Sequence, residues 1–368
     1  VGSLIGIYPI QGKGVVNGAS HKKLLAIGNL KQPVHAWGEI YTGISAKDYM
    51  DGTSNFYGVH SVTLYVDSVQ VFNSTTDKVL PDENRMINGF TDYEELTRTR
   101  RLIMRSYKLP GNRLRLLHPN ENRGAVTIDE ERDYHFRYVL EDNFGNRRTY
   151  QFIVKGKRQD IPEYKPEANE MLYWNRTNVI QKPGMELVVP RYYVYEDVPL
   201  RTDMRGDSSH IAFDYILDAG RTPIHSYCDL SIGLRHMPVA DTTKYYIVQK
   251  AGKWRSSMGG KYANGWIKTR VRSLGTFSVD VDTIAPQITP IGQGGWRTSR
   301  NIRFRIKDME SGIGSYKVYI DGKFVLFGLK KGILVIQDPE KVKKGVSHKL
   351  EVTVTDQCGN MTRKEYKF

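Results

Sequence analysis

The stretch Gly58-Val-His-Ser-Val-Thr-Leu-Tyr-Val-Asp67 decides the fold, because it returns near the end of the chain as Gly312-Ile-Gly-Ser-Tyr-Lys-Val-Tyr-Ile-Asp321. A second pair follows the first: Glu141-Asp-Asn-Phe-Gly-Asn146 reappears as Thr355-Asp-Gln-Cys-Gly-Asn360. Each copy of the second pair ends a run in which apolar residues occupy every second position. This alternation is typical of a half-buried antiparallel strand. The sequence therefore predicts an internal repeat of a small β domain.

The two pairs are offset differently along the chain, and the difference locates an insertion. The first pair is separated by 254 positions, from 58 to 312, and the second by 214, from 145 to 359, so the first copy carries 40 additional residues between Asp67 and Glu141. Within that stretch, Thr91-Asp-Tyr-Glu94 has the form of a capping box and precedes apolar residues at helical spacing. We predict one inserted helix near 91–107.

Length and linkers define the domain organisation. A chain of 368 residues is too long for one small sandwich, and Pro-bearing breaks at Arg158–Pro166 and Asp282–Pro286 each follow a β run. Short Gly, Asp and Asn turns between strands favour sandwiches over alternating strands and helices. The predicted fold is mainly β, with three consecutive β-sandwich domains: 1–158 with the inserted helix, 159–281, and 282–368 as a repeat of the first.

The composition indicates a basic chain without a membrane span. The formal net charge is +14 and the sequence pI is near 9.5, so nucleic acid, a lipid surface or an acidic wall polymer are the partners to consider. The basic residues are spread along the chain, and their clusters at Arg98–Arg105 and Lys341–Lys344 are not interleaved with stacking aromatics. We therefore expect a solvated basic face and no nucleic-acid partner. The sequence contains no run of eighteen apolar residues, so it predicts no transmembrane segment.

Cysteine content and the first residues bear on processing and compartment. Cys228 and Cys358 are the two cysteines, too few for a disulfide framework. Val1 is not an initiator residue, and Val1–Tyr8 lacks the charged start of a signal peptide. We expect the chain to be a processed or trimmed product.

The sequence contains no catalytic motif that we can identify. His210-Ile-Ala-Phe-Asp214 has the spacing of a metal-ligand pair, but a zinc enzyme needs three protein ligands and no His-x-His element occurs. His225 and His236 are the nearby candidates for a third ligand, and we favour a structural role for the pair. No Gly-x-Ser-x-Gly elbow and no phosphate-binding glycine loop is present. We predict no catalytic residues, no metal site and no cofactor in this chain.

Several acidic loops allow two interpretations. The loops Asp48–Gly52 and Asp308–Gly312 each place two acids before a glycine, which makes a calcium site conceivable. Two acids fall short of six ligands, whereas Asp and Ser before Gly are typical of tight turns. The Asp142–Asn146 and Asp356–Asn360 loops have the same turn chemistry.

Aromatic residues provide the candidates for ligand binding. Trp254, Tyr262 and Trp266 lie in a Gly-rich stretch where two hairpins would expose flat rings, and such rings can stack on sugars. The same residues could instead form the core of the middle sandwich. Burial of Trp254 and Trp266 distinguishes these two possibilities.

Four segments together resemble a known family: Ile7-Tyr-Pro-Ile-Gln-Gly-Lys-Gly-Val-Val-Asn17, Phe90-Thr-Asp-Tyr-Glu94, Asp282-Thr-Ile-Ala-Pro286 and Asp308-Met-Glu-Ser-Gly-Ile313. They are similar to the immunoglobulin-like region behind the catalytic domain of lysostaphin-type (LytM-like) zinc metallopeptidases of Gram-negative bacteria. The last two segments are widespread in bacterial immunoglobulin-like modules, whereas the first two are more particular.

The resemblance implies a non-catalytic accessory region of a peptidoglycan metalloendopeptidase, in the periplasm or cell envelope. Zinc would belong to the family's catalytic domain, which carries the zinc motifs and is absent from this chain, so no ligand role passes to His210 or Asp214. The implied partners are peptidoglycan or another envelope component and the chain's own peptidase domain. Two other classes remain open: an adhesion or glycan-binding module, and an independent hydrolase with titratable groups converging in a cleft.

Overall fold

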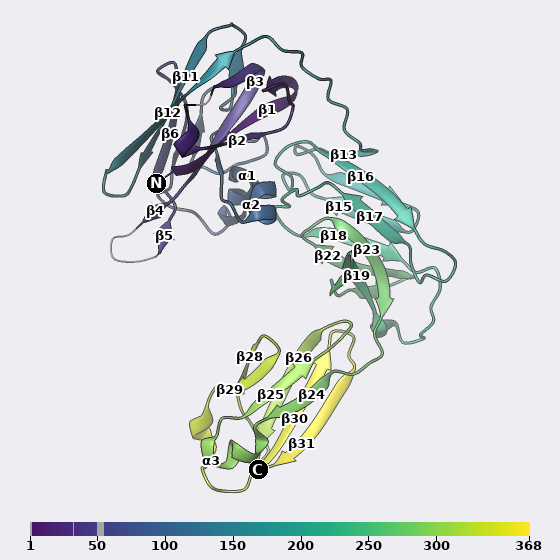
Figure 1. Ribbon diagram of the computed structural model, residues 1–368. Coiled ribbons are helices and arrows are strands. Elements are labelled where there is room, and N and C mark those ends of the chain that lie inside the picture. Colours follow the sequence, from purple (N-terminus) through teal and green to yellow (C-terminus); the bar gives the residue numbers. More distant parts are fainter. Residues whose placement is uncertain (1, 32, 50–54) are drawn as a thin grey trace. The chain divides into compact units, whose positions relative to one another are not determined.

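A computed structural model describes residues 2–31, 33–49 and 55–368, and strands make up most of its regular structure (Figure 1). The mainly β class predicted from the alternation is confirmed. The chain divides into two compact units, each of which is described by itself. The first unit comprises Val1–Asn178, Val189–Arg201 and Ala219–Ser226, and the second comprises Val179–Val188, Thr202–Asp218 and Tyr227–Phe368.

The first unit is built on a ten-stranded sheet of order β2-β1-β3-β12-β11-β6-β7-β9, with β8 and β10 also paired to β3. Its strands are β1 (Gly2–Val16), β2 (Lys23–Ala26), β3 (Val34–Ala46), β6 (Ser61–Val66), β7 (Val69–Thr75), β8 (Met104–Arg105), β9 (Leu117–Pro119), β10 (Val126–Ile128), β11 (Asp133–Glu141) and β12 (Arg147–Gly156). A short separate pair consists of β4 (Asp48–Tyr49) and β5 (Phe56–Tyr57). Parallel pairing of β12 with β3, where Val154 lies opposite Val34, joins the two groups of antiparallel strands.

The core of this sheet follows the alternation in the sequence. Phe136 and Tyr138 of β11 are buried, and the rings of Phe136 and Phe152 stack with centroids 5.0 Å apart. The hydroxyl of Tyr138 lies 2.7 Å from the hydroxyls of both Thr42 and Ser106. Because a buried polar group without a partner is costly, these contacts allow a tyrosine to occupy the centre of the core.

The segment expected to form one helix near 91–107 contains a shorter one. This helix is α2 (Tyr93–Thr99), and a second short helix, α1 (Ile87–Phe90), precedes the segment. The N-cap of α2 is Asp92, whose Oδ1 accepts a hydrogen bond from the backbone N–H of Glu95 at 3.0 Å. The N-cap predicted from the sequence was Thr91, so the predicted helix start was wrong by one residue.

The predicted end of the helix was also wrong. Arg100 adopts a left-handed conformation with φ of 66°, which ends α2, and residues 104–105 then form β8 against β3. Residues 104–105, which the apolar spacing assigned to the helix, are therefore paired in the sheet. The remaining helices are η1 (Ile27–Asn29), η2 (Asn84–Met86), η3 (Thr242–Lys244), η4 (Gln293–Gly295), α3 (Trp296–Ser299) and η5 (Pro339–Lys341). None of the helices in the described ranges is long and apolar enough to cross a membrane.

The middle segment forms two sheets, of orders β13-β16-β17-β23-β19-β20 and β14-β15-β18-β22-β21. Their strands are β13 (Glu170–Leu172), β14 (Asn178–Lys182), β15 (Met185–Val189), β16 (Val198–Arg205), β17 (Asp214–Asp218), β18 (Cys228–Gly233), β19 (Tyr245–Ala251), β20 (Trp254–Ser257), β21 (Lys261–Ala263), β22 (Trp266–Val271) and β23 (Gly275–Val281). Leu187, Leu230 and Ile267 are fully buried residues of the second sheet.

The C-terminal segment forms two four-stranded sheets, of orders β24-β25-β29-β28 and β27-β26-β30-β31. Their strands are β24 (Gln287–Ile291), β25 (Arg303–Lys307), β26 (Ile313–Ile320), β27 (Lys323–Phe324), β28 (Phe327–Lys330), β29 (Ile333–Ile336), β30 (Lys349–Asp356) and β31 (Met361–Lys367). Trp296 is completely buried, packs edge-on against Phe304 and donates its Nε1–H to the carbonyl of Ile291 at 3.0 Å.

The repeated sequences occupy equivalent strands. The order β12-β11-β6-β7 in the first unit corresponds to β31-β30-β26-β27 in the second. Val66 lies opposite Phe136 in one copy, and Ile320 lies opposite Leu350 in the other, as the two sequence offsets require. For these four strands, the structure has the arrangement that the repeat predicts.

Side-chain bonds to the backbone are repeated as well. Oδ1 of Asp67 accepts the N–H of His135, and Oδ1 of Asp321 accepts the N–H of Lys349, both at 2.9 Å. In the loops after β11 and β30, the first aspartate accepts N–H groups two and four residues further on, and its second oxygen accepts the Asn amide at 2.7 Å. This is the turn chemistry expected from Asp-x-x-x-Asn.

The three-domain division 1–158, 159–281 and 282–368 remains a prediction. The two compact units group residues by proximity and do not test where separately folding domains begin and end.

Stability of the second unit should depend on pH through His348. Its Nδ1 lies 2.6 Å from Oδ2 of Asp321, and its Nε2 lies 2.8 Å from the carbonyl of Lys343. Desolvation lowers the pKa of His348, but these two bonds outweigh it and raise the pKa above 6.5. A raised folded-state pKa gives stability that is complete below pH 6.5 and is lost as the pH rises through the folded value.

We expect wild-type protein to exceed His348→Gln in melting temperature at pH 6, and the difference to shrink towards pH 9. Thermal unfolding followed across this range measures the effect. A difference that stays constant with pH would contradict the assignment of the proton to this pair.

Candidate functional site

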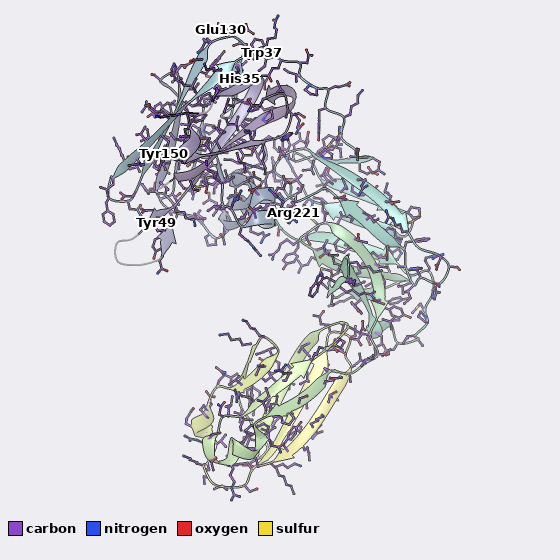
Figure 2. The ribbon with its side chains drawn as sticks, viewed as in Figure 1. His35, Trp37, Tyr49, Glu130, Tyr150 and Arg221 are labelled. Atoms are coloured by element: carbon purple, nitrogen blue, oxygen red, sulfur yellow. The ribbon has the colours of Figure 1, made fainter. Side chains whose placement is uncertain are left out.

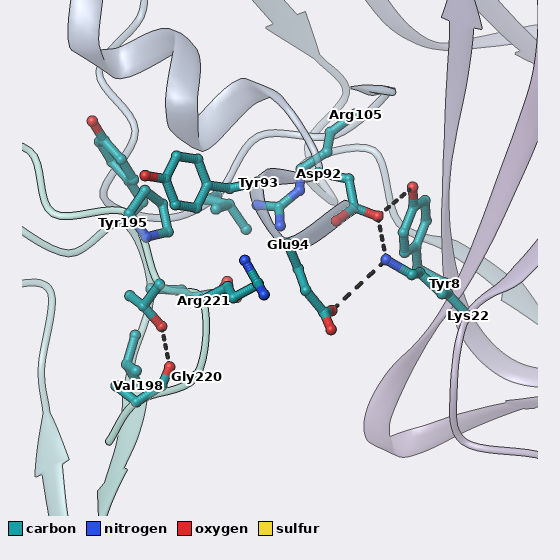
Figure 3. A pocket seen from close by; sticks show the side chains of 15 residues that line it. Tyr8, Lys22, Asp92, Tyr93, Glu94, Arg105, Tyr195, Val198, Gly220 and Arg221 are labelled. Carbon is teal, nitrogen blue, oxygen red and sulfur yellow. Dashed lines mark hydrogen bonds and ion pairs between the residues drawn. The ribbon is translucent and has the colours of Figure 1, made fainter. Parts of the chain in front are cut away.

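The described part of the first unit contains a polar cavity of about 440 Å³. Its lining includes Tyr8, Lys22, Asp92, Tyr93, Glu94, Arg105, Leu109, Tyr195, Glu196, Val198 and Ala219–Pro223. Figure 3 shows the side chains of Arg105, Glu94 and Arg221 reaching into the same space. Figure 2 marks the position of Arg221 within the whole chain. The cavity is thus assembled from segments that lie far apart in the sequence.

Asp92 fixes one wall of the cavity. While Oδ1 caps α2, Oδ2 accepts hydrogen bonds from Nζ of Lys22 at 2.8 Å and from the hydroxyl of Tyr8 at 3.2 Å. Its side chain is only 4% exposed, so these bonds form away from bulk water. One carboxylate therefore orients α2, β1 and the chain just before β2.

Glu95 lies behind this wall with no exposed side-chain surface. Its carboxylate is reached by Nζ of Lys22 at 3.3 Å, by Arg98 at 2.8 Å and by the hydroxyl of Thr99 at 2.8 Å. Desolvation alone would raise the pKa of Glu95, but the bonds from Thr99, Arg98 and Lys22 lower it below its usual 4.5. The group is therefore a buried anion held by three donors.

Removing the charge of Lys22 from this cluster should destabilise the first unit. We expect Lys22→Met to cost about 3 kcal/mol at pH 7, because the buried Asp92 loses the cation that pairs with it and Glu95 loses one of the cations around it. A depressed carboxyl pKa gives stability that is present above 4.5 and is lost as the pH falls. Urea unfolding should therefore show a smaller difference at pH 3 than at pH 7.

Lys155→Met provides the matched control, since Lys155 is exposed on β12. We expect it to leave stability unchanged. An equal loss of stability in the two variants at both pH values would show that the buried charges are not responsible.

Arg105 contributes the innermost cation of the cavity. It lies on β8 opposite Gly43, and its guanidinium is 5.4 Å from the centre of the Tyr107 ring. That ring stacks on Tyr41 with centroids 4.0 Å apart. Arg105 has a single long hydrogen bond, from Nη1 to the carbonyl of Gly89 at 3.4 Å, while its Nε is sealed from solvent without a partner among the described residues.

The opposite wall carries Tyr195 and Glu196. The hydroxyl of Tyr195 donates to the carbonyl of Arg85 at 2.8 Å and lies 3.0 Å from Nδ1 of His225. Glu196 keeps solvent-accessible surface, yet enough protein surrounds its carboxylate for desolvation to raise its pKa, against the opposing charge of Arg105. No hydrogen bond or ion pair to Glu196 occurs within the described ranges.

The tyrosines of the cavity remain protonated at neutral pH. Burial is the main cause of the raised pKa of Tyr8 and Tyr195, which line the cavity, and of Tyr107 beside Arg105. Their hydroxyls therefore act as hydrogen-bond donors and acceptors and do not act as bases. Together with guanidinium and carboxylate groups, they suit the cavity for holding a polar charged molecule.

The three aromatics predicted to bind a ligand do not share one surface. Trp254 begins β20 and is 81% exposed, whereas Tyr262 and Trp266 are partly buried. In the β21–β22 hairpin, Tyr262 lies opposite Ile267, which is completely buried, and Ala263 lies opposite Trp266. Because cross-strand partners share a face, Tyr262 is on the core face and Trp266 is on the other. Sugar binding by these residues remains a prediction, with Trp254 as its exposed member.

His210 and Asp214 have different partners in the second unit. Nδ1 of His210 lies 2.9 Å from Asp207, whereas Asp214 forms an ion pair with Lys250 at 2.6 Å. His225 contacts Tyr195 in the first unit, and His236 has no described contact with either residue. The structural role predicted for the His210–Asp214 pair is in keeping with these bonds.

We predict no stoichiometric zinc and no peptidase activity in the isolated chain, because the pair lacks a third ligand. Elemental analysis of purified protein measures the first, and release of peptide fragments from peptidoglycan measures the second. Tightly held zinc that is lost in His210→Ala would overturn this prediction. His348→Gln, which changes an unrelated histidine, is the control and should not alter the zinc content.

The sequence did not predict that three carboxylates of the second unit would lie close together. Oxygens of Asp282, Asp308 and Asp356 lie within 4.8 Å of one another. Those of Asp282 accept hydrogen bonds from Ser311 and Ile284, and those of Asp308 accept backbone N–H groups of its own loop. These bonds are the turn chemistry that the sequence favoured over calcium for Asp308–Gly312. The absence of a metal remains a prediction, and the other candidate loop, Asp48–Gly52, lies partly outside the described residues.

The two cysteines are buried thiols. Desolvation raises the pKa of Cys228 to about 12 and that of Cys358 to about 11. Both are therefore protonated at neutral pH and unsuited to nucleophilic attack.

The cavity itself was not predicted from the sequence. Its one visible signal was the cap of α2, which marked Asp92–Glu95 as an ordered helix start. Arg105 was seen only as part of a basic cluster, and Glu196 and Arg221 carried no signal. Loop residues brought together by tertiary structure have no spacing that a sequence pattern could reveal.

Comparison with protein families matches residues 169–282 to a Zu5-like domain. The match covers less than half of the chain. A search of curated proteins finds no matching sequence.

Several solved structures are matched at very low similarity. They include a calcium-stabilised adhesin with which an Antarctic bacterium binds ice (10% identity, 98% of each chain covered, TM-score 0.17) and a 1.5-MDa bacterial ice-binding adhesin (8% identity, 90% of this chain and 88% of that chain, TM-score 0.16). A third is a glucan-utilisation protein, SGBP-B, of Bacteroides ovatus in complex with a mixed-linkage heptasaccharide (12% identity, 84% and 59% covered, TM-score 0.15). TM-scores this low support no argument about this chain.

Proposed function

We propose that this chain is a non-catalytic binding part of a bacterial cell-envelope protein and that it attaches to carbohydrate. The observation that carries the proposal is the 81% exposure of Trp254. A large flat ring exposed to water is available for contact, and its apolar face suits the apolar face of a sugar. Trp254 is the member of the predicted aromatic set that meets this requirement.

The hairpin presents Trp254 on an ordered support. In the β19–β20 pair, Ala251 lies opposite Trp254 and Lys250 lies opposite Arg255. Arg255 is tied to Asp280 by an ion pair, which fixes the strand that carries the ring. A ring on a paired strand loses little conformational freedom on binding, which favours affinity.

Charge supports attachment to the envelope. The formal net charge of +14 attracts anionic polymers over a distance set by salt, roughly 8 Å at physiological ionic strength. We propose that peptidoglycan or another wall component is the surface approached, in the periplasm or at the cell surface. Charge would bring the chain to the polymer, and Trp254 would provide the local contact.

A second candidate is the accessory region of a peptidoglycan metalloendopeptidase, which positions or restrains a peptidase domain. The resemblance of Ile7–Asn17 and Phe90–Glu94 to that family favours it. In the structure, these segments form β1 and the N-terminal cap of α2, which meet through the Tyr8–Asp92 hydrogen bond. Zinc would then be held by the peptidase domain. The two candidates share a non-catalytic role for this chain.

We expect Trp254→Ala to weaken retention on the bound polymer about tenfold, because loss of one stacking contact is worth roughly 1.4 kcal/mol. Co-sedimentation with purified peptidoglycan and with insoluble β-glucan, at low and high salt, measures the effect. Phe144→Ala is the matched control, because Phe144 is also an exposed aromatic ring, at 91%, but belongs to the first unit.

Unchanged retention in Trp254→Ala would contradict the aromatic site. If retention of both the wild-type protein and Trp254→Ala disappears at high salt, attachment is through charge alone. Binding to neither polymer, together with binding to a purified peptidase domain, would favour the second candidate.

A further inference from the structure

Arg105 lies in the cavity of the first unit without an anion in direct contact, although Glu196 and Asp92 attract its charge from a greater distance. Arg105 forms no ion pair within 4 Å among the residues that the structure describes, and its only hydrogen bond is the 3.4 Å contact with the carbonyl of Gly89. Its Nε is sealed from solvent without a partner. A guanidinium whose hydrogen-bond donors are largely unused is suited to contact an incoming anion directly.

A second guanidinium reaches the same space. Arg221 belongs to the loop Ala219–Pro223, which is held by a hydrogen bond from the hydroxyl of Thr222 to the carbonyl of Ala219 at 2.6 Å. Arg221 is exposed and has no hydrogen bond or ion pair to a described residue. Figure 3 shows its side chain directed into the cavity towards Glu94.

Lys22 is not available to a ligand in the same way. Its Nζ already bonds to Asp92 at 2.8 Å and lies 3.3 Å from Glu95. The cations left for an incoming anion are therefore the two arginines, and guanidinium groups match the two oxygens of a carboxylate.

The cavity also offers two carboxyl groups that no side chain holds closely. Glu94 is 61% exposed, and its ion pair with Lys22 is long, at 3.7 Å. Glu196 faces the same cavity without a hydrogen bond to any described residue. A ligand with only negative charge would be attracted by the arginines and repelled by Glu94, Glu196 and Asp92. A ligand that carries one negative and one positive group can contact the arginines and the carboxyl groups at the same time.

We propose that this cavity binds a zwitterionic molecule of the amino-acid or short-peptide type. Its carboxylate contacts Arg105 and Arg221, and its ammonium group contacts Glu94 and Glu196. A volume of about 440 Å³ is in the range of small-molecule sites and accommodates a dipeptide. The proposal concerns a site in the first unit and does not rest on carbohydrate binding at Trp254, which lies in the second unit.

Isothermal titration of the full chain with L-alanyl-L-alanine, whose side chains carry no charge, tests the proposal. Two blocked probes accompany it: the N-acetylated dipeptide, which lacks the ammonium group, and the dipeptide amide, which lacks the carboxylate. We expect the free dipeptide to bind and each blocked probe to bind at least about tenfold more weakly, because hydrogen bonds to charged groups are worth roughly 1.5–3 kcal/mol.

Variants assign the binding to the cavity. Arg221→Ala and Glu94→Gln change exposed side chains, so they should fold normally and weaken dipeptide binding about tenfold. Arg148→Ala, which removes an exposed arginine of β12 in the same unit, should leave binding unchanged. Trp254→Ala should also leave it unchanged, which separates this site from the proposed carbohydrate site.

Three results would overturn the proposal. They are the absence of dipeptide binding at millimolar concentration, equal binding of the free and blocked dipeptides, and unchanged binding in both Arg221→Ala and Glu94→Gln. Galacturonate is included as a carboxylate without an ammonium group. Tighter binding of galacturonate than of the dipeptide would reject the zwitterion and assign the cavity to acidic sugars.

Discussion

The first unit depends on a buried anion. Glu95 has no exposed side-chain surface, and its charge is compensated by Lys22, Arg98 and Arg101 and by the hydroxyl of Thr99. The same lysine binds Asp92, which caps α2 and bonds to Tyr8. The short helix is therefore fixed to the first strand by charge and not by an apolar face, since seven residues offer little area to bury. Because α2 forms one wall of the cavity, the position of Glu94 follows from this cluster.

The strands could be predicted from the sequence, whereas the insertion could not be predicted in detail. Alternation with a period of two fixes both the face and the register of a strand, and the offsets of the repeat place Val66 opposite Phe136 and Ile320 opposite Leu350. The helix was overextended because Leu102 and Ile103 have helical spacing, yet Arg100 adopts a left-handed conformation and Met104 pairs with Ile44. Competition between a helix and a sheet edge is decided by tertiary contacts, which local spacing does not contain.

The same distinction applies to the candidate sites. A sequence motif can show a site when its residues are neighbours in the chain, as Trp254, Tyr262 and Trp266 are. Even there, the pleat separates the residues, because Tyr262 lies opposite the buried Ile267 and Trp266 does not. The cavity presents the opposite case: Arg105, Glu196 and Arg221 are distant in sequence, and only folding gives them a common environment. Composition showed that charged residues were plentiful but not which of them lacked partners.

The two copies of the repeat show where such a chain is free to diverge. Both keep the aspartate and asparagine of the loop between the paired strands, because these side chains bind the backbone and define the turn. The residue two positions after the aspartate contributes its backbone N–H to the turn, but its side chain is not needed there. In one copy it is Phe144, 91% exposed, and in the other it is Cys358, buried in a cluster with Tyr246 and Val248. The backbone of the loop is thus retained by hydrogen bonding, while its central side chain adapts to whatever it faces. New surfaces in this fold therefore arise at loop positions that the turn does not use, while the paired strands keep the register that the repeat first revealed.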